Sequence, residues 1–345
     1  MAASVLESEI REQPEAVERL LARVEDDLRP LAAVVERRPP SYVLVAARGT
    51  SDNAARYAQY LLGGRLGLPV ALAAPSLTSV YADESRLRIR DALVIGISQS
   101  GRSPDVVEVL RVAREGGSPS VAMTNDPESP LAAAADFVVP LCAGPERAVA
   151  ATKTYTASLV ALAALDAMLR GARDDLDRLH ALPAVLADAV NLAFADVAAL
   201  DGHAAARHVL SLGRGVNLAT AFELALKVRE LCAVVAEGFS PADILHGPIA
   251  ATAPGTPVLV VDVGGPARES LAEAVAALEA RGAAPARITD VAGDGPALRI
   301  PRGLPEWLTP IAAIVPGQVY ALHQATLRGL DVDRPAGLTK VTPTF

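Results

Sequence analysis

Short apolar runs alternate with amphipathic stretches along this 345-residue chain, and the alternation constrains the fold more than any other feature of the sequence. Five such runs occur in its first part: 42–47 (YVLVAA), 69–74 (PVALAA), 91–98 (DALVIGIS), 120–125 (SVAMTN) and 137–141 (FVVPL). A strand that is apolar along its whole length must be covered on both faces, which is typical of parallel sheets between layers of helices. The pattern therefore predicts an α/β fold built on parallel sheets.

The stretches between these runs have helical character. Helices are expected over 4–37, 54–66, 103–117 and 152–171. In the third of them Ser103 suits the N-cap and Pro104 the first helical position, where a missing N–H costs nothing. The last is apolar on all sides, which indicates a largely buried helix that closes a domain.

The second half of the chain repeats the plan of the first. Residues 208–230 align with 42–64, so that Arg214-Gly215 match Arg48-Gly49. Residues 256–265 (TPVLVVDVGG) then stand where DALVIGISQSG stands in the first half. Such self-similarity predicts two related α/β domains in tandem. The expected division is an N-terminal helical segment over 1–40, a first domain over 41–175 and a second domain over 176–345.

Composition excludes several classes of protein. The net charge is −8 and the pI about 5.3, whereas a general nucleic-acid binder normally shows a basic face. Cys142 and Cys232 are the only cysteines and lie far apart, so no disulfide framework or zinc site is expected. The N-terminus is polar and acidic, unlike a signal peptide, and no uninterrupted apolar run is long enough for a membrane span. We expect a soluble, cytoplasmic protein that binds neither nucleic acid nor membrane.

Residues 96–105 (GISQSGRSPD) crowd hydroxyls, an amide and two glycines into the turn that follows a predicted buried strand. Hydroxyls and free backbone N–H groups at such a place suit an anion, most often a phosphate. The alternative is an ordinary polar turn whose Ser and Asp side chains only cap the next helix. A second polar turn, RGTSDN at 48–53, also follows a strand, and ligands of doubly wound sheets bind at the carboxyl ends of strands. Both turns together favour the phosphate interpretation.

Seven motifs occur in order along nearly the whole chain: SEIREQP at 8–14, GTS at 49–51, SQSGRSPD at 98–105, VAATKTYT at 149–156, ELALKVRE at 223–230, ILHGP at 244–248 and GLTKVTPTF at 337–345. Together they resemble the double-SIS-domain sugar isomerases, which include the isomerase part of glutamine–fructose-6-phosphate transaminase and stand-alone SIS-type glucosamine-6-phosphate deaminases. The resemblance implies two tandem SIS domains, each a doubly wound, flavodoxin-like parallel sheet flanked by helices. No glutaminase domain precedes SEIREQP, and residue 2 is alanine rather than a cysteine nucleophile, so amidotransfer from glutamine is not expected.

The resemblance also implies a set of substrate contacts. The residues that align with the family's sugar-phosphate-binding turns are Ser51, Ser98, Gln99, Ser100 and Ser103. Val149 matches a backbone contact to the sugar, and Ala151 stands where the transaminase has a serine, so one hydroxyl contact is expected to be lost. Thr152 and Lys153 are equally well explained as polar residues at a helix N-terminus.

Glu223, Lys227 and Glu230 are spaced so that they share one face of a helix. A solvated ladder of ion pairs is the usual reading of such spacing. The flanking residues are apolar, however, and Glu230 aligns with the family's proton-transfer base, with Glu223 and Lys227 among the substrate-binding positions. Burial of such a carboxylate would favour its protonated form, which suits a group that both gives and takes a proton.

Two further residues take roles from the resemblance. His246 matches the acid–base that opens the sugar ring, and an imidazole suits proton transfer near neutral pH. Lys340 matches the lysine that forms a Schiff base with the keto sugar, although a frayed terminal lysine is its ordinary reading. The other histidines are read as structural: His180, His203, His208 and His323. No second histidine has metal-ligand spacing to His246, so neither a metal nor another cofactor is expected.

The leading hypothesis is a glucosamine-6-phosphate deaminase that converts an amino-sugar 6-phosphate into fructose 6-phosphate and ammonia by aldose–ketose isomerisation. The alternatives are a synthase-like isomerase that uses free ammonia, a fructosamine-6-phosphate deglycase, and a sugar-phosphate sensor without catalysis. The residues preceding the first strand are too few and too acidic for the DNA-binding segment usual in SIS sensors. The resemblance further implies a homodimer in which His246 enters the active site of the neighbouring subunit.

Overall fold

The computed structural model describes residues 3–84, 87–291, 293 and 295–340. The chain divides into two compact units. The first unit comprises Glu15–Glu146, Lys153–Pro183 and residues 339–340, and the second comprises residues 3–14, Arg147–Thr152 and Ala184–Leu338. Both units are therefore discontinuous in sequence, because short segments from far along the chain join each of them. The boundaries at residues 40 and 175 stay a prediction.

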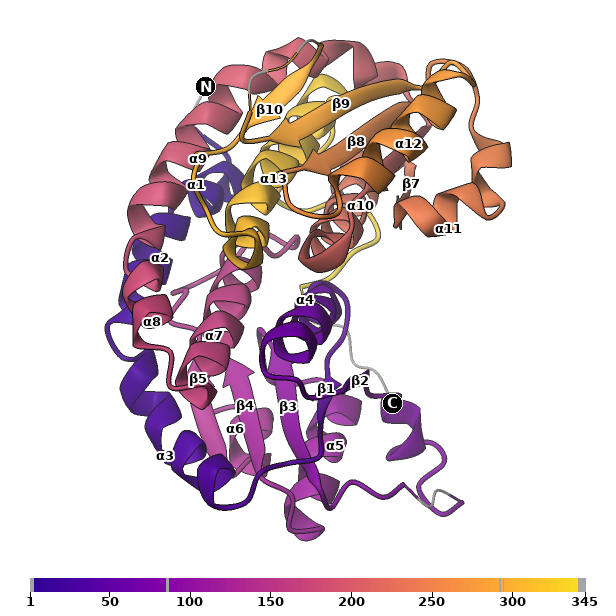
Figure 1. The fold of residues 1–345 in the computed structure, drawn as a ribbon. Coiled ribbons are helices and arrows are strands. Elements are labelled where there is room, and N and C mark those ends of the chain that lie inside the picture. The colour runs from indigo at the N-terminus through magenta and orange to yellow at the C-terminus, as the bar shows by residue number, and fades with distance from the viewer. Residues whose placement is uncertain (1–2, 85–86, 292, 294, 341–345) are drawn as a thin grey trace. The chain divides into compact units, whose positions relative to one another are not determined.

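The first unit is built on a parallel five-stranded sheet with the order β2-β1-β3-β4-β5 (Figure 1). Its strands are β1 (Tyr42–Ala46), β2 (Val70–Leu72), β3 (Ala92–Ser98), β4 (Ser120–Thr124) and β5 (Phe137–Pro140). All five coincide with the apolar runs that predict them. The central strand β3 is buried at every position, as expected for a strand covered on both faces.

Helices cover this sheet and continue the N-terminal segment. They are α2 (Gln13–Leu21), α3 (Val24–Arg37), α4 (Thr50–Arg65), α5 (Pro104–Glu115), α6 (Pro130–Ala134), α7 (Lys153–Leu169) and α8 (Arg173–Leu179), with a 3-10 turn, η1 (Pro75–Leu77). Helix α1 (Val5–Arg11) belongs to the second unit. Ser103 is the N-cap residue of α5, although its side chain makes no capping hydrogen bond. Every residue of α7 from Lys153 to Ala167 is buried, which confirms the buried helix predicted there. The core on one side of the sheet packs Val94, Leu110 and Leu131 together.

The second unit repeats this topology with a parallel sheet of order β10-β9-β8-β6-β7. Its strands are β6 (His208–Leu212), β7 (Val235–Phe239), β8 (Pro257–Asp262), β9 (Ala284–Thr289) and β10 (Ala297–Arg299). In both units the first strand of the sheet lies between the second and the third, which is the flavodoxin-like order. The predicted fold class is therefore confirmed, and the second sheet contains three strands, β7, β9 and β10, that the sequence alone did not reveal.

The helices of the second unit frame the residues of interest. They are α9 (Leu182–Asp196), which begins at the end of the first unit, α10 (Leu218–Cys232), α11 (Pro241–Leu245), α12 (Arg268–Glu279) and α13 (Thr309–Leu327). Short 3-10 segments join them: η2 (Val197–Ala205), η3 (Gly215–Asn217), η4 (Pro248–Ala251) and η5 (Glu306–Leu308). Helix α10 follows β6 as α4 follows β1, so the aligned segments 208–230 and 42–64 occupy equivalent places in their sheets.

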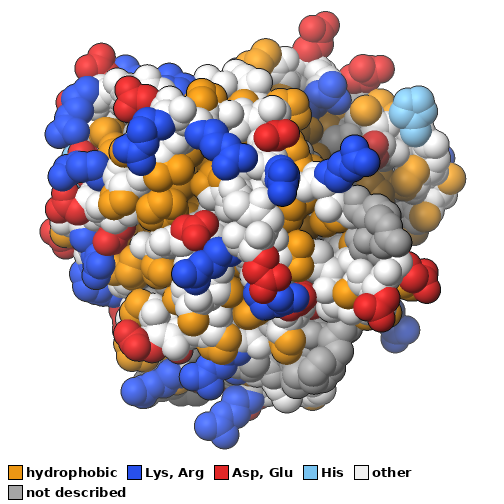
Figure 2. Space-filling view, turned by 90° about the horizontal axis from the view of Figure 1, so that it is seen from below, with side chains coloured by type: hydrophobic (Ala, Val, Ile, Leu, Met, Phe, Trp, Pro, Cys, Tyr) orange, Lys and Arg blue, Asp and Glu red, His pale blue; other side chains and the backbone are white. Residues whose placement is uncertain are grey.

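Among the described residues, the helical run Leu182–Ala205 is long and apolar enough to cross a membrane by length and composition alone. One such run is weak evidence for a span, and 33% of its most apolar window is buried within the structure. On the face drawn in Figure 2, Lys and Arg side chains lie interspersed with Asp and Glu side chains. A cytoplasmic location, and the absence of nucleic-acid and membrane partners, stay predictions.

Candidate functional site

The turn between β3 and α5 holds most of the predicted phosphate contacts. Ser98 ends β3, and its Oγ accepts a hydrogen bond from the Gly101 N–H at 3.1 Å, while the Ser100 Oγ accepts from the Arg102 N–H at 3.3 Å. Gly101 has a φ of +62°, and a Cβ there would lie 2.1 Å from the Ser129 Oγ, so only glycine fits. The turn is therefore a tight loop in which short hydroxyl side chains surround backbone N–H groups.

The turn after β1 lies at the same edge of the sheet, because β1 and β3 are adjacent and parallel. Gly49, with a φ of +56°, precedes α4, and the half-buried Ser51 lies in its first turn. The Arg48 Nε donates to the Asp105 Oδ2 at 2.7 Å, and Asp105 is almost fully buried at the start of α5. This ion pair joins the two predicted phosphate-binding turns. Neither Arg48 nor Asp105 is predicted for that role from the sequence alone.

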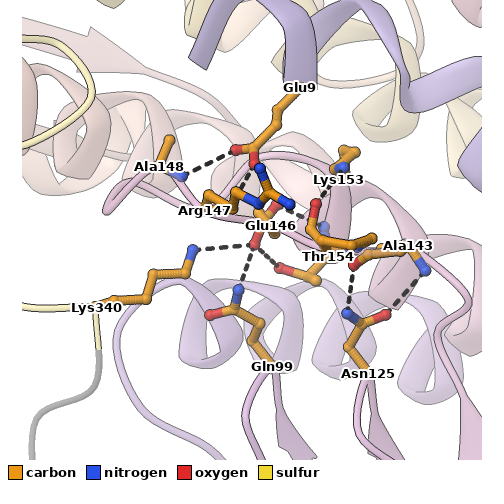
Figure 3. Close-up of polar contacts among 12 residues, drawn as sticks. Glu9, Gln99, Asn125, Ala143, Glu146, Arg147, Ala148, Lys153, Thr154 and Lys340 are labelled. Atoms are coloured by element: carbon orange, nitrogen blue, oxygen red, sulfur yellow. Dashed lines mark hydrogen bonds and ion pairs between the residues drawn. The ribbon is translucent and has the colours of Figure 1, made fainter. Parts of the chain in front are cut away.

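Glu146 organises the opposite side of this turn (Figure 3). Its Oε2 accepts hydrogen bonds from the Gln99 Nε2 and the Thr154 Oγ1, both at 2.8 Å, and its Oε1 accepts from the Thr154 N–H at 3.1 Å. The Lys340 Nζ lies 3.4 Å from the same Oε2. The Glu146 side chain is fully buried, so these donors satisfy a carboxylate that would otherwise be costly to bury.

A cavity of about 260 Å³ opens beside these groups. It is lined by Gln99, Ser100, Arg102, Asn125, Asp126, Glu146 and Lys340. Asn125 is fixed by two bonds: its Nδ2 donates to the Gly144 carbonyl at 2.8 Å, and its Oδ1 accepts from the Ala143 N–H at 2.9 Å. Lys340 is 24% exposed and points to Glu146 rather than into solvent, so it is not a frayed terminal side chain.

Helix α10 carries the predicted acid–base group in the second unit. The Lys227 Nζ lies 2.5 Å from the Glu230 Oε2 and 3.4 Å from the Glu223 Oε1, so the three side chains do share one face. Glu223 and Lys227 are buried, which excludes a solvated ladder for these two. Glu230 is 24% exposed, so the strong burial expected for it applies instead to its two neighbours.

Glu230 opens onto a cavity of about 440 Å³ within the second unit. The rest of its lining is Arg229, Leu231, Ala233, Leu330, Asp331, Arg334, Pro335, Ala336 and Leu338. Ala233, the residue after α10, has a φ of +53°, so the chain turns sharply just after Glu230. A carboxylate at the wall of a mostly apolar cavity is suitably placed for proton transfer.

His246 ends α11, and its N–H donates to the carbonyls of Ala242 and Asp243 at 3.2 and 3.3 Å. His246 is exposed in the single chain. The other four histidines have partners in the described structure: His180 with Glu25, His203 with Tyr320, His208 with Glu237 and His323 with Asp201. Burial also lowers the pKa of His203. These contacts agree with a structural reading of those four.

The segment from Arg147 to Thr152 belongs to the second unit. The Glu9 carboxylate accepts from the N–H groups of Arg147 and Ala148 at 2.5 and 3.3 Å (Figure 3). The Val149 N–H donates to the Asp333 carbonyl at 3.2 Å. That bond uses the Val149 N–H within the chain, so the predicted sugar contact would have to come from its carbonyl. Ala151 and Thr152 end the segment.

The rarity of lysine is a further signal in the sequence that points to these motifs. Only three of the 32 basic residues are lysines, namely Lys153, Lys227 and Lys340, and each falls within a recognised motif. Lys153 is buried at the start of α7, where its Nζ donates to the Pro145 carbonyl at 2.8 Å. A lysine ammonium is a compact charge that can lose its proton and react as an amine, whereas a guanidinium stays charged. Among the described residues, no group of three His, Cys, Asp or Glu side chains is arranged to hold a metal ion.

Comparison with known proteins identifies this architecture. The SIS domain family profile matches residues 39–168 and 204–297, which contain both sheets nearly completely. The glutamine–fructose-6-phosphate aminotransferase (isomerizing) of Zymomonas mobilis is 34% identical over 97% of the chain, and the chain spans 58% of the length of that enzyme. The chain therefore belongs to the SIS domain family, with two SIS domains in tandem.

Solved structures agree with this assignment. A provisionally assigned phosphosugar isomerase from Silicibacter pomeroyi DSS-3 is 37% identical with a TM-score of 0.86, covering 96% of this chain and 99% of that one. The C-terminal domain of glucosamine-fructose-6-phosphate aminotransferase from Francisella tularensis is 25% identical with a TM-score of 0.87, covering 97% and 99%. Glucosamine-6-phosphate deaminase from Thermotoga maritima, at 21% identity and a TM-score of 0.77 over 99% and 100%, shares the fold. The similar proteins are thus sugar-phosphate enzymes, and the similarity to the aminotransferases covers their isomerase part.

Proposed function

We propose that this protein is an aldose–ketose isomerase of the kind found in the isomerase part of the aminotransferases. In the proposed reaction, fructose 6-phosphate and ammonia give glucosamine 6-phosphate and water, and the reaction is reversible. The observation that carries the proposal is that Lys340 lines the same cavity as Gln99 and Ser100. A reactive amine beside a phosphate-binding turn is the arrangement that a phosphorylated keto sugar requires.

Each proposed residue has a distinct chemical role. The hydroxyls and N–H groups of the β3–α5 turn hold the phosphate. The Lys340 amine attacks the keto carbon and forms an imine with loss of water. Ammonia then displaces the Lys340 amine, which is released unchanged, and leaves the free imine of the sugar, whose neighbouring carbon is acidic. Glu230 then moves a proton between the first two carbons of the sugar, and His246 moves the proton that opens its ring. The roles of Glu230 and His246 follow from the family resemblance.

The direction of the reaction separates this proposal from a deaminase. Both activities use the same isomerisation, run in opposite directions. The 34% identical relative is an aminotransferase, whereas the deaminase similarity is at 21% identity and supports the fold alone. We therefore favour the isomerase of the aminotransferase type over the deaminase. A sensor without catalysis would have no need for a lysine held in the cavity by Glu146.

Trapping the imine tests the proposal directly. Fructose 6-phosphate and cyanoborohydride should add one sugar phosphate to the chain, and peptide mapping should place it on Lys340. Lys153 and Lys227 are buried and serve as internal controls. Lys340→Arg keeps the positive charge opposite Glu146 and should abolish both the adduct and turnover. Normal turnover by Lys340→Arg, or an adduct on another lysine, would exclude this mechanism.

Assays in both directions then fix the reaction. Glucosamine 6-phosphate should form from fructose 6-phosphate and ammonium, as measured by chromatography of the products. Ammonia release from glucosamine 6-phosphate without the reverse synthesis at high ammonium would favour the deaminase instead.

We further propose a homodimer in which His246 serves the partner's active site. Mixing the inactive variants His246→Ala and Glu230→Gln should then restore roughly a quarter of wild-type turnover, because about half of the dimers are mixed and each has one native site. Subunit exchange confirmed by mass spectrometry without recovered activity would mean that His246 serves its own subunit.

A further inference from the structure

A second polar cavity lies in the second unit, at the carboxyl ends of β8 and β9 beside the start of α12. Figure 1 shows these three elements next to one another. The cavity has a volume of about 270 Å³ and is lined by Asp262, Arg268, Arg287, Thr289, Val291, Gly293 and Ala297. None of these residues belongs to the proposed isomerase site.

The cavity carries a net positive charge. The Arg287 Nη1 lies 2.8 Å from the Asp262 Oδ2, and the Arg268 Nε lies 3.4 Å from the Asp262 Oδ1. The two arginine side chains are 37% and 50% exposed, so each guanidinium has donors left for a ligand. Two guanidinium groups converging on one small cavity favour an oxyanion, because their forked donors match its oxygens.

Asp262 gives this cavity a second property. Its side chain is only 8% exposed, and its Oδ1 has no hydrogen-bond partner among the described residues. The contact with Arg268 at 3.4 Å is an ion pair that is not aligned as a hydrogen bond. Buried polar atoms nearly always have a partner, so this oxygen indicates a donor that a ligand would bring.

We propose that this cavity binds a phosphate group that carries a P–OH hydrogen, either as inorganic phosphate or on a small monoester. Arg268 and Arg287 bind the anionic oxygens, and the Asp262 Oδ1 accepts the hydrogen of the P–OH group. Sulfate at neutral pH has no hydrogen to donate, so Asp262 repels it and the site selects phosphate.

Binding is measured on the full chain carrying Ser98→Ala and Ser100→Ala, which weakens the proposed substrate site in the other unit. Calorimetric titration with inorganic phosphate should reveal one site per chain, with sulfate bound at least ~10-fold more weakly. Adding Arg268→Gln should weaken phosphate binding at least ~10-fold, since it removes charge-assisted hydrogen bonds. Arg207→Gln, an exposed arginine of the same unit outside the cavity, is the matched control and should change nothing. Equal effects of the two substitutions would overturn the proposal.

Three further substitutions keep the test decisive if Arg268→Gln does not fold. Asp262→Asn should remove the preference for phosphate over sulfate, because an amide can donate to sulfate. Val291 is partly exposed at the cavity, so Val291→Glu should weaken phosphate binding and Val291→Lys should strengthen it. Unchanged affinity in both Val291 variants, or equal binding of sulfate and phosphate by the unmodified cavity, would refute the site.

Titration with glucosamine 6-phosphate distinguishes the two sources of the phosphate group. Tighter binding than inorganic phosphate in the same background assigns the site to a monoester, and weaker binding assigns it to inorganic phosphate. A chain with native Ser98 and Ser100 that shows no turnover would count against the proposed isomerase function and not against this cavity. The two proposals therefore fail separately.

Discussion

The two units have the same strand order but differ in the turns that follow their two central strands. In the first unit the turns after β1 and β3 carry Ser51, Ser98 and Ser100, and the cavity beside them is open. In the second unit the corresponding turns carry Gly215 and Gly265, and the Glu306 side chain lies against both. A Cβ placed on Gly265 would lie 2.9 Å from the Glu306 Cδ, and one on Gly215 would lie 3.6 Å from its Oε1.

This difference shows what the shared topology provides and what it leaves to side chains. A parallel sheet directs the N-termini of its helices toward one edge, which favours a negative group there. The first unit has hydroxyls at this place and an open cavity, whereas the second has a carboxylate of its own. The second unit carries Glu230 at the end of α10, and the cavity that we propose as a phosphate site lies to the side, between β8, β9 and α12. The same fold supports different tasks because the residues at its edge differ.

The largest effect is expected from the second unit. If Glu230 transfers the proton, Glu230→Gln should reduce kcat by about 10²–10⁴-fold with little change in KM. Steady-state kinetics measures this. Glu237→Gln, an exposed glutamate of the same unit that pairs with His208, is the matched control. A Glu230→Gln variant with near-normal kcat would end the assignment of chemistry to this unit.

The first unit should respond in KM rather than in kcat. Ser98→Ala combined with Ser100→Ala should raise KM for the phosphorylated sugar at least tenfold, because each charge-assisted hydrogen bond contributes about 1.5–3 kcal/mol. Ser270→Ala, on α12 of the second unit, is the control and should leave KM unchanged. Equal weakening for a non-phosphorylated amino sugar would mean that the serines do not contact phosphate.

The glycines of the two turns allow a comparison of stability. Gly101 and Gly215 both have φ near +60°, so alanine at either position costs about 1–2 kcal/mol in backbone strain. At Gly101 the new Cβ also meets Ser129 and Thr124, which adds about 1–3 kcal/mol of overpacking. Gly101→Ala should therefore lower the free energy of urea unfolding more than Gly215→Ala. The reverse order would show that the turn of the first unit yields more easily than its contacts suggest.

The smallest expected effect concerns the two cysteines, one in each unit. Burial raises the pKa of both thiols, and that of Cys232 reaches about 11. Cys232 is also nearly inaccessible, whereas Cys142 is partly exposed. Because the thiolate is the nucleophile, Cys142 should alkylate about tenfold faster than Cys232 at pH 8, and both rates should rise with pH. Mass spectrometry of timed iodoacetamide reactions measures the ratio, and faster labelling of Cys232 would show that α10 opens readily.

The sequence by itself determined the local structure and the duplication. The apolar runs predict β1 to β5, and the segment 208–230 predicts the second sheet, because strand character and turn chemistry depend on neighbouring residues. The motif resemblance also named Lys340 and Glu230 before any geometry was known. The sequence did not reveal β7, β9 and β10. Strand β7 contains a glutamate and a glycine, β9 contains a proline and an arginine, and β10 has only three residues.

Only the tertiary structure decided which side chains meet. Glu146 and Lys340 are 194 residues apart, and Arg48 and Asp105 are 57 apart, so no local pattern links them. Their contacts exist because strands and helices pack at fixed distances and bring distant segments to one sheet edge. The same packing places Glu306 against the glycines of the second unit and leaves the Asp262 oxygen facing a cavity. Periodicity identifies elements, whereas the partners of a buried charge depend on how those elements pack.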